Sequence, residues 1–333
     1  MEKINIAIIG LGSMGSRRAR IIRRLFPSFG VVGVDMQEQR RQDFAQEFSL
    51  PVFESLTEAL NKVQLDAAII STSPLSHGGI ANKCLALGLH VFTEINLQPL
   101  MYNENLKLAQ VNKVKLFLSS TFLYRKETQF IKQKVSKSGA PLSYIYHVGQ
   151  YLPDWHPWED YRNYFVAKRE SNACRELFAI ELPWLTATFG EIEGVKVVSN
   201  KMTQLDLPYH DNYMVIIIHK GGCKGMIAVD VVSREAVRDF CVYGENLFIQ
   251  WDGTSNGLKE KNLVTKEMSA VELYGSEAAR HDNRYSQNII ENAYEDEIEA
   301  FVTCIIEDRQ PDYGYEDDLK ILSWIDIIEG IEQ

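Results

Sequence analysis

A glycine turn between a short apolar run and a basic, helix-like stretch constrains this chain more than any other feature. Residues 4–9 are mostly apolar, and the letters GLGSMG occupy 10–15 directly after them. A second apolar run, 31–34, ends on Asp35, twenty residues after the turn. Strand, glycine turn, helix, strand and acid in this order are typical of a dinucleotide site in a parallel α/β sheet.

Each glycine of the turn has a role in such a site. Gly10 permits the tight turn, Gly12 lets the backbone approach a pyrophosphate, and Gly15 lets the helix pack close to the strand. Ser13 and Met14 lie in this turn, and the N-terminus of the helix that follows offers N–H groups and a positive dipole to phosphates. An ordinary glycine turn in an α/β domain is the alternative, but it leaves the spaced acid unexplained. We therefore predict a nicotinamide dinucleotide as cofactor.

The acid at the end of the second strand bears on which dinucleotide binds. Asp35 can accept hydrogen bonds from the ribose 2′- and 3′-hydroxyls, and its charge repels a 2′-phosphate. Arg40 and Arg41 follow closely and either reach a 2′-phosphate or form the solvated face of the next helix. The sequence therefore favours NAD over NADP.

Strand and helix patterns alternate through the first third of the chain, as in a doubly wound parallel α/β sheet with helices on both faces. This predicts an N-terminal Rossmann domain over residues 1–122, with strands near 4–9, 31–35, 66–70, 90–93 and 115–119. Cofactors bind beyond the carboxyl ends of such strands. We therefore place along the cofactor the residues after the third strand, namely Thr72, Ser73, Pro74 and His77. A capping or solvent-facing position at a helix start is an equal alternative for His77.

After about residue 122 the strand-like runs become longer and closer together, with hairpin-like turns between some of them. They lie at 142–150, 195–202, 212–219, 224–231, 238–243 and 246–251, and helical patterns lie at 174–189, 286–307 and 315–331. Such spacing is typical of a mixed or antiparallel sheet. We predict a C-terminal α+β domain over residues 123–333.

Charge and composition argue against several classes of function. The net charge of −10, with no basic run beyond 17–24, argues against nucleic-acid binding, which needs a basic surface. The arginines of that run are expected on a solvated helix face; they are Arg17, Arg18, Arg20, Arg23 and Arg24. The five scattered cysteines lack zinc spacing, which predicts reduced thiols, no metal site and a cytoplasmic location. We expect no membrane association, because no apolar signal segment or span-length run occurs.

Several segments together resemble the glucose–fructose oxidoreductase / inositol dehydrogenase / MocA (Gfo/Idh/MocA) oxidoreductases, nearly end to end. They are 10–15 with Asp35, 66–77, 86–94, and 294–301 with Pro311 and the closing helix. The resemblance implies hydride transfer between NAD(P) and a hydroxyl or carbonyl carbon of a sugar, cyclitol or sugar nucleotide. It also implies that the C-terminal domain has an open sheet, binds the substrate, and uses the face of that sheet to form homodimers or homotetramers.

The chain departs from this family at its usual catalytic residues. Family members carry Glu-Lys-Pro where this chain has Glu94, Ile95 and Asn96, and their lysine polarises the reacting oxygen near the nicotinamide. They also carry an aspartate and, four residues later, a histidine, at the positions of Glu176 and Ile180. Neither isoleucine exchanges a proton, although hydride transfer at an oxygen-bearing carbon needs a proton partner. Glu94 is retained and is expected beside the cofactor.

Three other side chains are candidates for the missing groups. Asn96 can hydrogen-bond a substrate oxygen but is not a base. Glu176 and Glu181 can each supply a carboxylate base whose pKa is raised by burial. They are five residues apart and point about 140° apart around a helix, so only one is expected to face the site. The alternative for either is a salt bridge to Arg175 or Arg169.

An aromatic loop at 151–162 is the most unusual stretch outside the first domain. Trp155 and Trp158 can stack on sugar rings, and His156 is a candidate for proton transfer. The alternative is that these aromatic residues only fix the loop to the sheet. Tyr124 and Arg125 fall where the family often places an arginine, and we expect them to contact substrate or to bridge the domains.

Functions from different classes fit these residues. The first is an NAD-dependent oxidoreductase acting on a small carbohydrate-like molecule, with His156, Glu181 or Glu176 as the proton donor. The second is a dinucleotide-binding protein with little or no dehydrogenase activity and a regulatory or assembly role, which the two isoleucines favour. A third keeps NAD bound and uses it transiently, for epimerisation or elimination. The spacing of Tyr164 and Lys168 resembles that in short-chain dehydrogenases, but the glycine pattern differs, so we treat it as coincidence.

Overall fold

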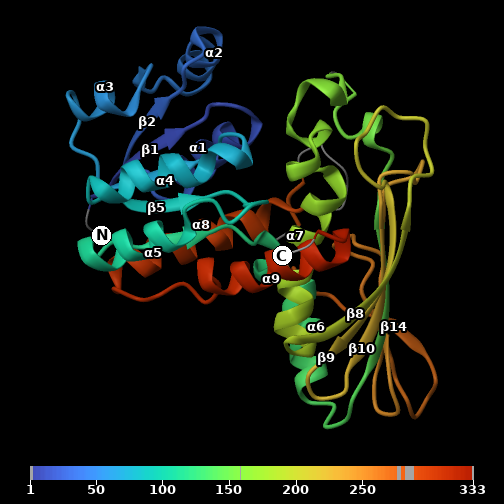
Figure 1. The fold of residues 1–333 in the computed structure, drawn as a ribbon. Helices are drawn as coiled ribbons and strands as arrows, with labels where there is room; N and C mark the ends of the chain where they lie inside the picture. The colour runs from blue at the N-terminus through green and yellow to red at the C-terminus, as the bar shows by residue number, and fades with distance from the viewer. Residues whose placement is uncertain (1–2, 158, 276–278, 282–288, 332–333) are drawn as a thin grey trace. The chain divides into compact units, whose positions relative to one another are not determined.

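The computed structural model describes residues 3–157, 159–275, 279–281 and 289–331. The chain divides into two compact units (Figure 1). The first consists of Met1–Ser120 with Tyr294–Lys320, and the second of Thr121–Ala293 with Ile321–Gln333. The first unit is therefore discontinuous in sequence, because the chain leaves it after Ser120 and returns to it at Tyr294.

A parallel sheet of six strands, in the order β3-β2-β1-β4-β5-β6, forms the centre of the first unit. Its strands are β1 (Asn5–Ile9), β2 (Gly30–Val34), β3 (Val52–Phe53), β4 (Ala67–Ile70), β5 (His90–Thr93) and β6 (Leu116–Leu118). The connecting helices are α1 (Ser13–Leu25), α2 (Glu38–Phe48), α3 (Leu56–Leu60), η1 (Pro74–Ser76), α4 (His77–Ala86) and α5 (Tyr102–Asn112). The chain order reverses between β1 and β4, which is where such sheets bind ligands.

The strands of this sheet form where apolar residues run without interruption. All four residues of β4 are buried, as expected for a parallel strand covered on both faces. The returning segment covers part of the sheet with α8 (Glu291–Ile306), and α9 (Tyr315–Glu329) follows it. The ring of Phe301 on α8 lies 5.5 Å from that of Phe92 on β5 and 5.7 Å from that of Phe117 on β6.

The second unit is built on a mixed sheet of eight strands in the order β14-β13-β12-β11-β7-β10-β9-β8. Among the described strands of this sheet, only β7 and β10 pair in parallel, and the other neighbours are antiparallel. The strands are β7 (Ser143–Gly149), β8 (Ile192–Asn200), β9 (Asn212–His219), β10 (Lys224–Asp230), β11 (Val237–Tyr243), β12 (Phe248–Trp251), β13 (Lys259–Lys261) and β14 (Met268–Ala270). Its helices are η2 (Thr121–Tyr124), α6 (Lys126–Ser136), η3 (Leu152–Asp154), η4 (Tyr161–Asn163), η5 (Phe165–Ala167), η6 (Arg169–Ser171) and α7 (Ala173–Phe189).

The two faces of this sheet differ. On one face Tyr144 of β7 stacks on Phe189 of α7 at 4.4 Å between ring centroids, and the neighbouring Tyr146 meets Trp184 at 5.7 Å. Helices α6 and α7 lie on this side, and no described helix covers the other side (Figure 1). The predicted architecture, a Rossmann domain followed by an α+β domain with an open mixed sheet, is confirmed.

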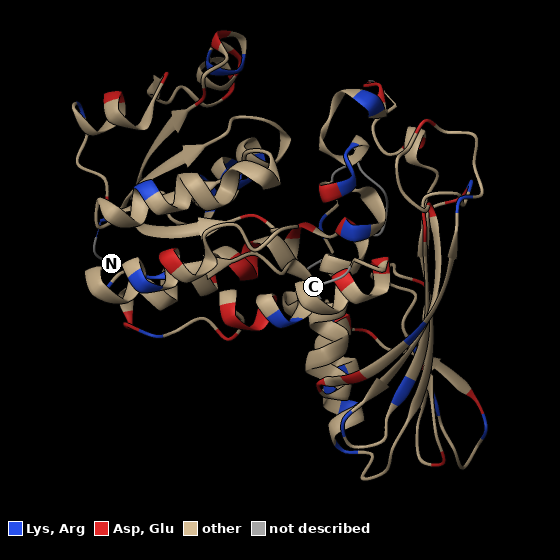
Figure 2. Ribbon diagram, in the orientation of Figure 1, with Lys and Arg blue, Asp and Glu red and all other residues tan. Residues whose placement is uncertain are grey.

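Residues of both charges are interspersed along the described chain (Figure 2). None of the described helices is long and apolar enough to span a membrane. All five cysteines are free thiols. Among the described residues, no three His, Cys, Asp or Glu side chains are grouped so that they could hold a metal ion.

Candidate functional site

The glycine turn after β1 has the geometry that a dinucleotide phosphate requires. Gly10 has a φ of 94°, and a Cβ added to it would lie 2.7 Å from the backbone of Ser71. A Cβ on Gly15 would lie 1.9 Å from the carbonyl oxygen of Gly10. At Gly12, by contrast, nothing lies within 4 Å of the added atom. The protein's own packing therefore requires Gly10 and Gly15, whereas Gly12 borders the open space that a pyrophosphate needs.

Helix α1 begins beside this space. Gly12 is its N-cap and provides no side-chain oxygen, so the backbone of Ser13 and Met14 begins the helix without a competing cap. Helix N-termini bind phosphate through backbone N–H groups and the helix dipole. The turn and the helix together therefore fit a bound dinucleotide.

Asp35 follows β2 and is held in place by backbone groups. Its Oδ2 accepts from the N–H of Leu11 at 2.8 Å, and its Oδ1 accepts from the N–H of Gln37 at 2.8 Å. A carboxylate oxygen has about two acceptor positions, so each still has one for a ribose hydroxyl. Arg40 lies 3.7 Å from Oδ2, while Arg41 donates to the carbonyl of Asp35 and to that of the next residue. Arg41 is thus occupied with the loop backbone.

The loop after β4 is tied to the loop after β5. The ring of His77 is fully buried, with Nδ1 3.0 Å from Oδ1 of Asn96 and Nε2 2.9 Å from the carbonyl oxygen of Thr72. Burial lowers the pKa of His77, so the ring is neutral at pH 7. Ser73 and Pro74 lie between these contacts, where η1 begins. The solvent-facing alternative for His77 is wrong, and both ring nitrogens position the loop backbone and Asn96.

Arg18 and Glu94 form a buried ion pair behind the glycine turn. Nε and Nη2 of Arg18 donate to the two carboxylate oxygens of Glu94 at 2.7 and 2.9 Å, and Nη2 also donates to Glu297 at 2.7 Å. The expectation that the arginines of α1 share a solvated face is therefore wrong for Arg18, which is 0 % exposed, and for Arg17, which is 3 % exposed. Burial lowers the pKa of Arg18, but the two carboxylates raise it by more.

This ion pair changes the role expected of Glu94. Both oxygens of Glu94 are engaged, and the hydroxyl of Ser71 also donates to it at 3.3 Å. Glu94 thus fixes the ends of β4 and β5 to α1. The position of Arg18, three residues after Gly15 and so on the same side of the helix, was the sequence signal for its burial.

The structure separates the two candidate carboxylates of α7. Glu181 is fully buried and accepts from Tyr146 Oη at 2.8 Å, Trp184 Nε1 at 2.7 Å and Arg238 Nε at 2.9 Å. Its salt bridge is therefore to Arg238, a partner that was not anticipated. These three contacts leave Glu181 a structural role in the second unit.

Glu176 instead lines a cavity of about 500 Å³ on the second unit. Trp155, His156 and Ile180 also line the cavity, so it brings together three of the predicted catalytic and substrate residues of this unit, Glu176, His156 and Trp155. Burial raises the pKa of Glu176 from its ordinary 4.5 to about 7. Burial also lowers the pKa of half-buried His156. The cavity thus contains a carboxyl that exchanges a proton at neutral pH.

Other polar groups in this cavity were not predicted. Arg234, Arg238, Asp154, Glu235 and Gln150 lie on its walls. Most of them follow β10 or start β11, and nothing in the periodicity of those strands marked them. They give the cavity charges of both signs, which suit a polar ligand better than an apolar one.

The remaining predicted substrate residues are arranged differently. Arg125 is 2 % exposed, and its guanidinium donates to Glu127 at 3.1 Å and to the carbonyl of Gly253 at 3.1 Å. The structure therefore buries Arg125 within its own unit, and its contact with substrate stays a prediction. Tyr124 is half-buried at the end of η2. Trp158 lies outside the described residues.

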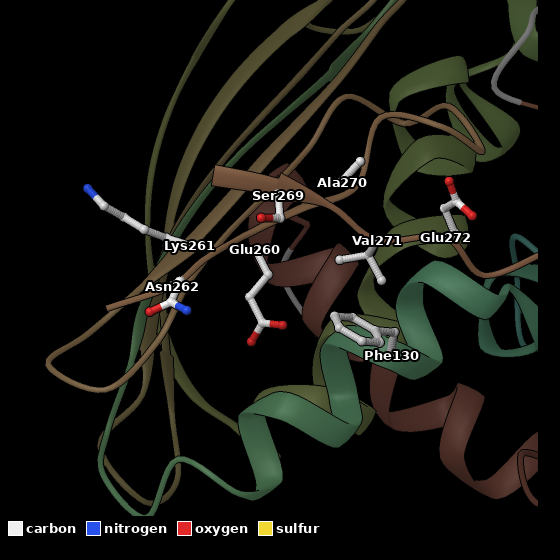
Figure 3. A pocket seen from close by; sticks show the side chains of 8 residues that line it. All are labelled: Phe130, Glu260, Lys261, Asn262, Ser269, Ala270, Val271 and Glu272. Atoms are coloured by element: carbon white, nitrogen blue, oxygen red, sulfur yellow. The ribbon is translucent and has the colours of Figure 1, made fainter. Parts of the chain in front are cut away.

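A second cavity of the same unit, of about 570 Å³, lies between α6 and the strands β13 and β14 (Figure 3). Phe130 and Val271 line it, and the one carboxylate on β13, Glu260, is bound by Lys134 Nζ at 2.7 and 2.8 Å. Glu272 is the second carboxylate of its lining, and neither a histidine nor an arginine accompanies it, so this cavity offers fewer groups for proton transfer than the one lined by Glu176.

A comparison with known protein families finds a match for the first unit. Residues 4–120 match the model of the oxidoreductase family with an NAD-binding Rossmann fold, Gfo/Idh/MocA. These residues are similar to the NAD-binding domain of that family, and the predicted cofactor, NAD, agrees with the match. No curated protein matched the sequence.

Solved structures extend the likeness of fold to almost the whole chain. An oxidoreductase from Agrobacterium radiobacter, in complex with NAD+, L-tartaric acid and magnesium, superposes with a TM-score of 0.81 at 12 % identity, over 99 % of this chain and 96 % of the other. UDP-N-acetylglucosamine 3-dehydrogenase GnnA from Acidithiobacillus ferrooxidans gives 0.77 at 18 %, over 99 % and 98 %. The WlbA dehydrogenase from Bordetella pertussis, in complex with NADH and UDP-GlcNAcA, gives 0.79 at 17 %, over 99 % and 96 %.

Proposed function

We propose that this protein is an NAD-dependent oxidoreductase that transfers hydride to or from an oxygen-bearing carbon of a carbohydrate-like substrate, with Glu176 as its proton carrier. One observation supports this most. Glu176 stands at the position of the family's aspartate, lines a cavity beside His156, and has a pKa raised to about 7 by burial. A group whose pKa is near the working pH is the most effective general acid or base.

The chain's own residues would act as follows. The turn at 10–15 and Asp35 hold the dinucleotide, which accepts or supplies the hydride when it is bound. In the direction of oxidation, ionised Glu176 takes the hydroxyl proton while the carbon gives up its hydride. In reduction, protonated Glu176 returns that proton to the new alkoxide oxygen. His156, neutral at pH 7, lines the same cavity and can donate or accept one hydrogen bond to a substrate hydroxyl.

A carbohydrate-like substrate is supported by the lining of the same cavity. Trp155 donates its Nε1–H to the carbonyl of Gln150 at 3.0 Å, which fixes the indole against the cavity wall. Fixed indole faces stack well on sugar rings, and the charged residues around it can bind hydroxyls. Two proteins with the same fold, GnnA and WlbA, are named for or bound to sugar nucleotides, which supports this class of substrate.

The test is to measure turnover of a panel of sugars, cyclitols and UDP-sugars by the change in nicotinamide absorbance. Glu176→Gln should lower turnover by at least about 100-fold, the usual contribution of a general base, with NADH affinity unchanged. Glu193→Gln, on an exposed residue of β8, is the matched control. Equal turnover in Glu176→Gln and wild type would remove Glu176 from the mechanism. NADH binding without turnover on any substrate would favour the alternative, a dinucleotide-binding protein without dehydrogenase activity.

We further propose that the open face of the second unit's sheet joins copies of the chain into homodimers or homotetramers. Ile216, Met226 and Ile145 are neighbours in register across β9, β10 and β7, and they are 47 %, 43 % and 44 % exposed. A contiguous apolar patch of this kind is costly in water. Ile145→Lys together with Ile216→Lys should lower the mass measured by sedimentation equilibrium to that of one chain. An unchanged mass would exclude this face.

We propose a cytoplasmic location as well. The five cysteines are free, and Cys84, Cys174 and Cys304 among them are buried. Unpaired thiols are usual in compartments kept reducing by glutathione and thioredoxin. Cell fractionation with an antibody to the native chain checks this, and recovery in a secreted or membrane fraction would contradict it.

A further inference from the structure

Tyr164 is a half-buried tyrosine that packs on His156 of the Glu176 cavity, and the mechanism above does not use it. It is the N-cap of η5, and its ring packs on that of His156 with 5.1 Å between centroids and 40° between planes. The hydroxyl is buried and makes no hydrogen bond to any described residue. Buried hydroxyls almost always have a partner. This one is therefore expected to gain a partner in another state of the site.

Glu176 is the acceptor that fits. Its carboxyl accepts no hydrogen bond from the described residues, and burial alone accounts for the direction in which its pKa moves. The two groups are also close enough to interact. After burial, which is the larger cause, the charge of Glu176 raises the pKa of Tyr164. Donor and acceptor thus lie in one cluster around His156, and both lack a partner of their own.

We propose that Tyr164 is a positioning residue that donates a hydrogen bond from its hydroxyl to the Glu176 carboxylate whenever Glu176 is ionised. A hydrogen bond to the charged form of a carboxyl favours that form. Tyr164 would therefore hold the base in one orientation while it waits for a substrate proton. Once Glu176 is protonated, its oxygen is a weaker acceptor and the bond is released. The role of this bond in catalysis rests on the proposed function of Glu176, whereas its existence does not depend on that function.

Other charges around the cluster form a constant background. Asp154, His156, Arg234, Glu235 and Arg238 line the same cavity as Glu176. The charge of Glu159 acts on both Tyr164 and His156. Removing one hydroxyl leaves all of these charges in place, so a change in the titration of Glu176 is attributable to the lost hydrogen bond.

The decisive variant is Tyr164→Phe, which keeps the ring on His156 and removes only the oxygen. The pKa of Glu176 is measured by NMR in protein labelled with ¹³C at the glutamate carboxyls, with its signal assigned by its loss in Glu176→Gln. Tyr164→Phe should raise that pKa by about one pH unit relative to wild type. Tyr209→Phe is the matched control, because the Tyr209 hydroxyl donates to the carbonyl of Val166 at 2.8 Å. An identical Glu176 titration in Tyr164→Phe and wild type would overturn the proposal.

A second measurement needs no change at Tyr164 and remains decisive if that variant fails to fold. In wild-type protein labelled with ¹³C at the tyrosine Cζ, one tyrosine signal should move with the Glu176 titration and stay still in Glu176→Gln. Absence of such a signal would also overturn the proposal. If turnover is found, the acidic limb of its pH profile should rise by the same amount in Tyr164→Phe. If no substrate is turned over, the proposed function fails while the NMR titration still decides on the hydrogen bond.

Discussion

Replacing Glu176 with glutamine should make the second unit more stable at alkaline pH, although it removes the proposed catalytic group. The folded protein holds this carboxyl in a cavity where burial raises its pKa to about 7, whereas in the unfolded chain it returns to about 4.5. Ionised Glu176 therefore costs folding energy above neutral pH. Glutamine has nearly the same shape and carries no charge at any pH, so it avoids that cost.

The size and sign of the effect follow from proton linkage. Below pH 4.5 the carboxyl is protonated in both states and contributes nothing. Between pH 4.5 and 7 the unfolded chain loses the proton first, so the free energy of unfolding falls as pH rises. Above pH 7 the full difference between the two pKa values applies. Each pKa unit corresponds to about 1.4 kcal/mol, so the free energy of unfolding is lower by about 3 kcal/mol. This is an upper limit, because Glu176 is half-buried and the cavity keeps some solvent screening.

Urea unfolding followed by tryptophan fluorescence measures this directly. All five tryptophans, at 155, 158, 184, 251 and 324, belong to the second unit, so the signal reports on that unit alone. Glu176→Gln should be more stable than wild type by up to about 3 kcal/mol at pH 8.5 and by half of that or less at pH 5.5. Glu193→Gln should give no difference at either pH, since it is exposed. A stability difference in Glu176→Gln that does not change with pH would refute the reasoning.

Three further predictions concern the first unit. Asp35→Ala should weaken NADH binding measured by calorimetry by about tenfold or more, because charge-assisted hydrogen bonds to the ribose are lost; unchanged affinity would mean that the ribose lies elsewhere. Gly12→Ala should keep the melting temperature of the apoprotein but lose NADH affinity, whereas Gly15→Ala should lose both, since its Cβ would meet the carbonyl of Gly10 at 1.9 Å; equal behaviour of the two variants would contradict this. Arg18→Met should cost about 3–5 kcal/mol of unfolding free energy, because it leaves two carboxylates buried without their cation. Arg20→Met, which breaks an exposed pair with Glu47, is its control and should cost under about 1 kcal/mol.

The parts of the fold that the sequence predicted are those where a local pattern decides the structure. Short apolar runs that are buried on both faces can be predicted from the local sequence alone. Such runs form β1, β2, β4, β5 and β6. The β3 strand was missed because it is two residues long, and β13 and β14 because they are short and largely polar. Helix α6 was missed because its sequence, KETQFIKQKVS, has few apolar residues to mark a periodic face.

The side-chain partners at the site could not be predicted from the local sequence. Sequence spacing showed that only one of Glu176 and Glu181 should face the site, but not which one. The choice depends on Arg238, which lies 57 residues after Glu181 and pairs with it across the fold. Arg18 was assigned to a solvated face because its neighbours are basic, and its burial depends on Glu297, 279 residues away. The side of the helix that Arg18 shares with Gly15 indicates its burial, but local periodicity does not indicate which distant residues are the partners.

The discontinuity of the first unit has a consequence for how the protein is made. A ribosome that adds about 5–20 residues per second synthesises Glu297 roughly 15–60 s after Arg18. During that time Arg18 on α1 lacks the second of its two carboxylate partners. The first unit is therefore completed only after most of the second unit has been synthesised. Until then its strands β5 and β6 are not covered by Phe301. The family match ends at residue 120, but a gene fragment that ends there would always lack Glu297 and Phe301.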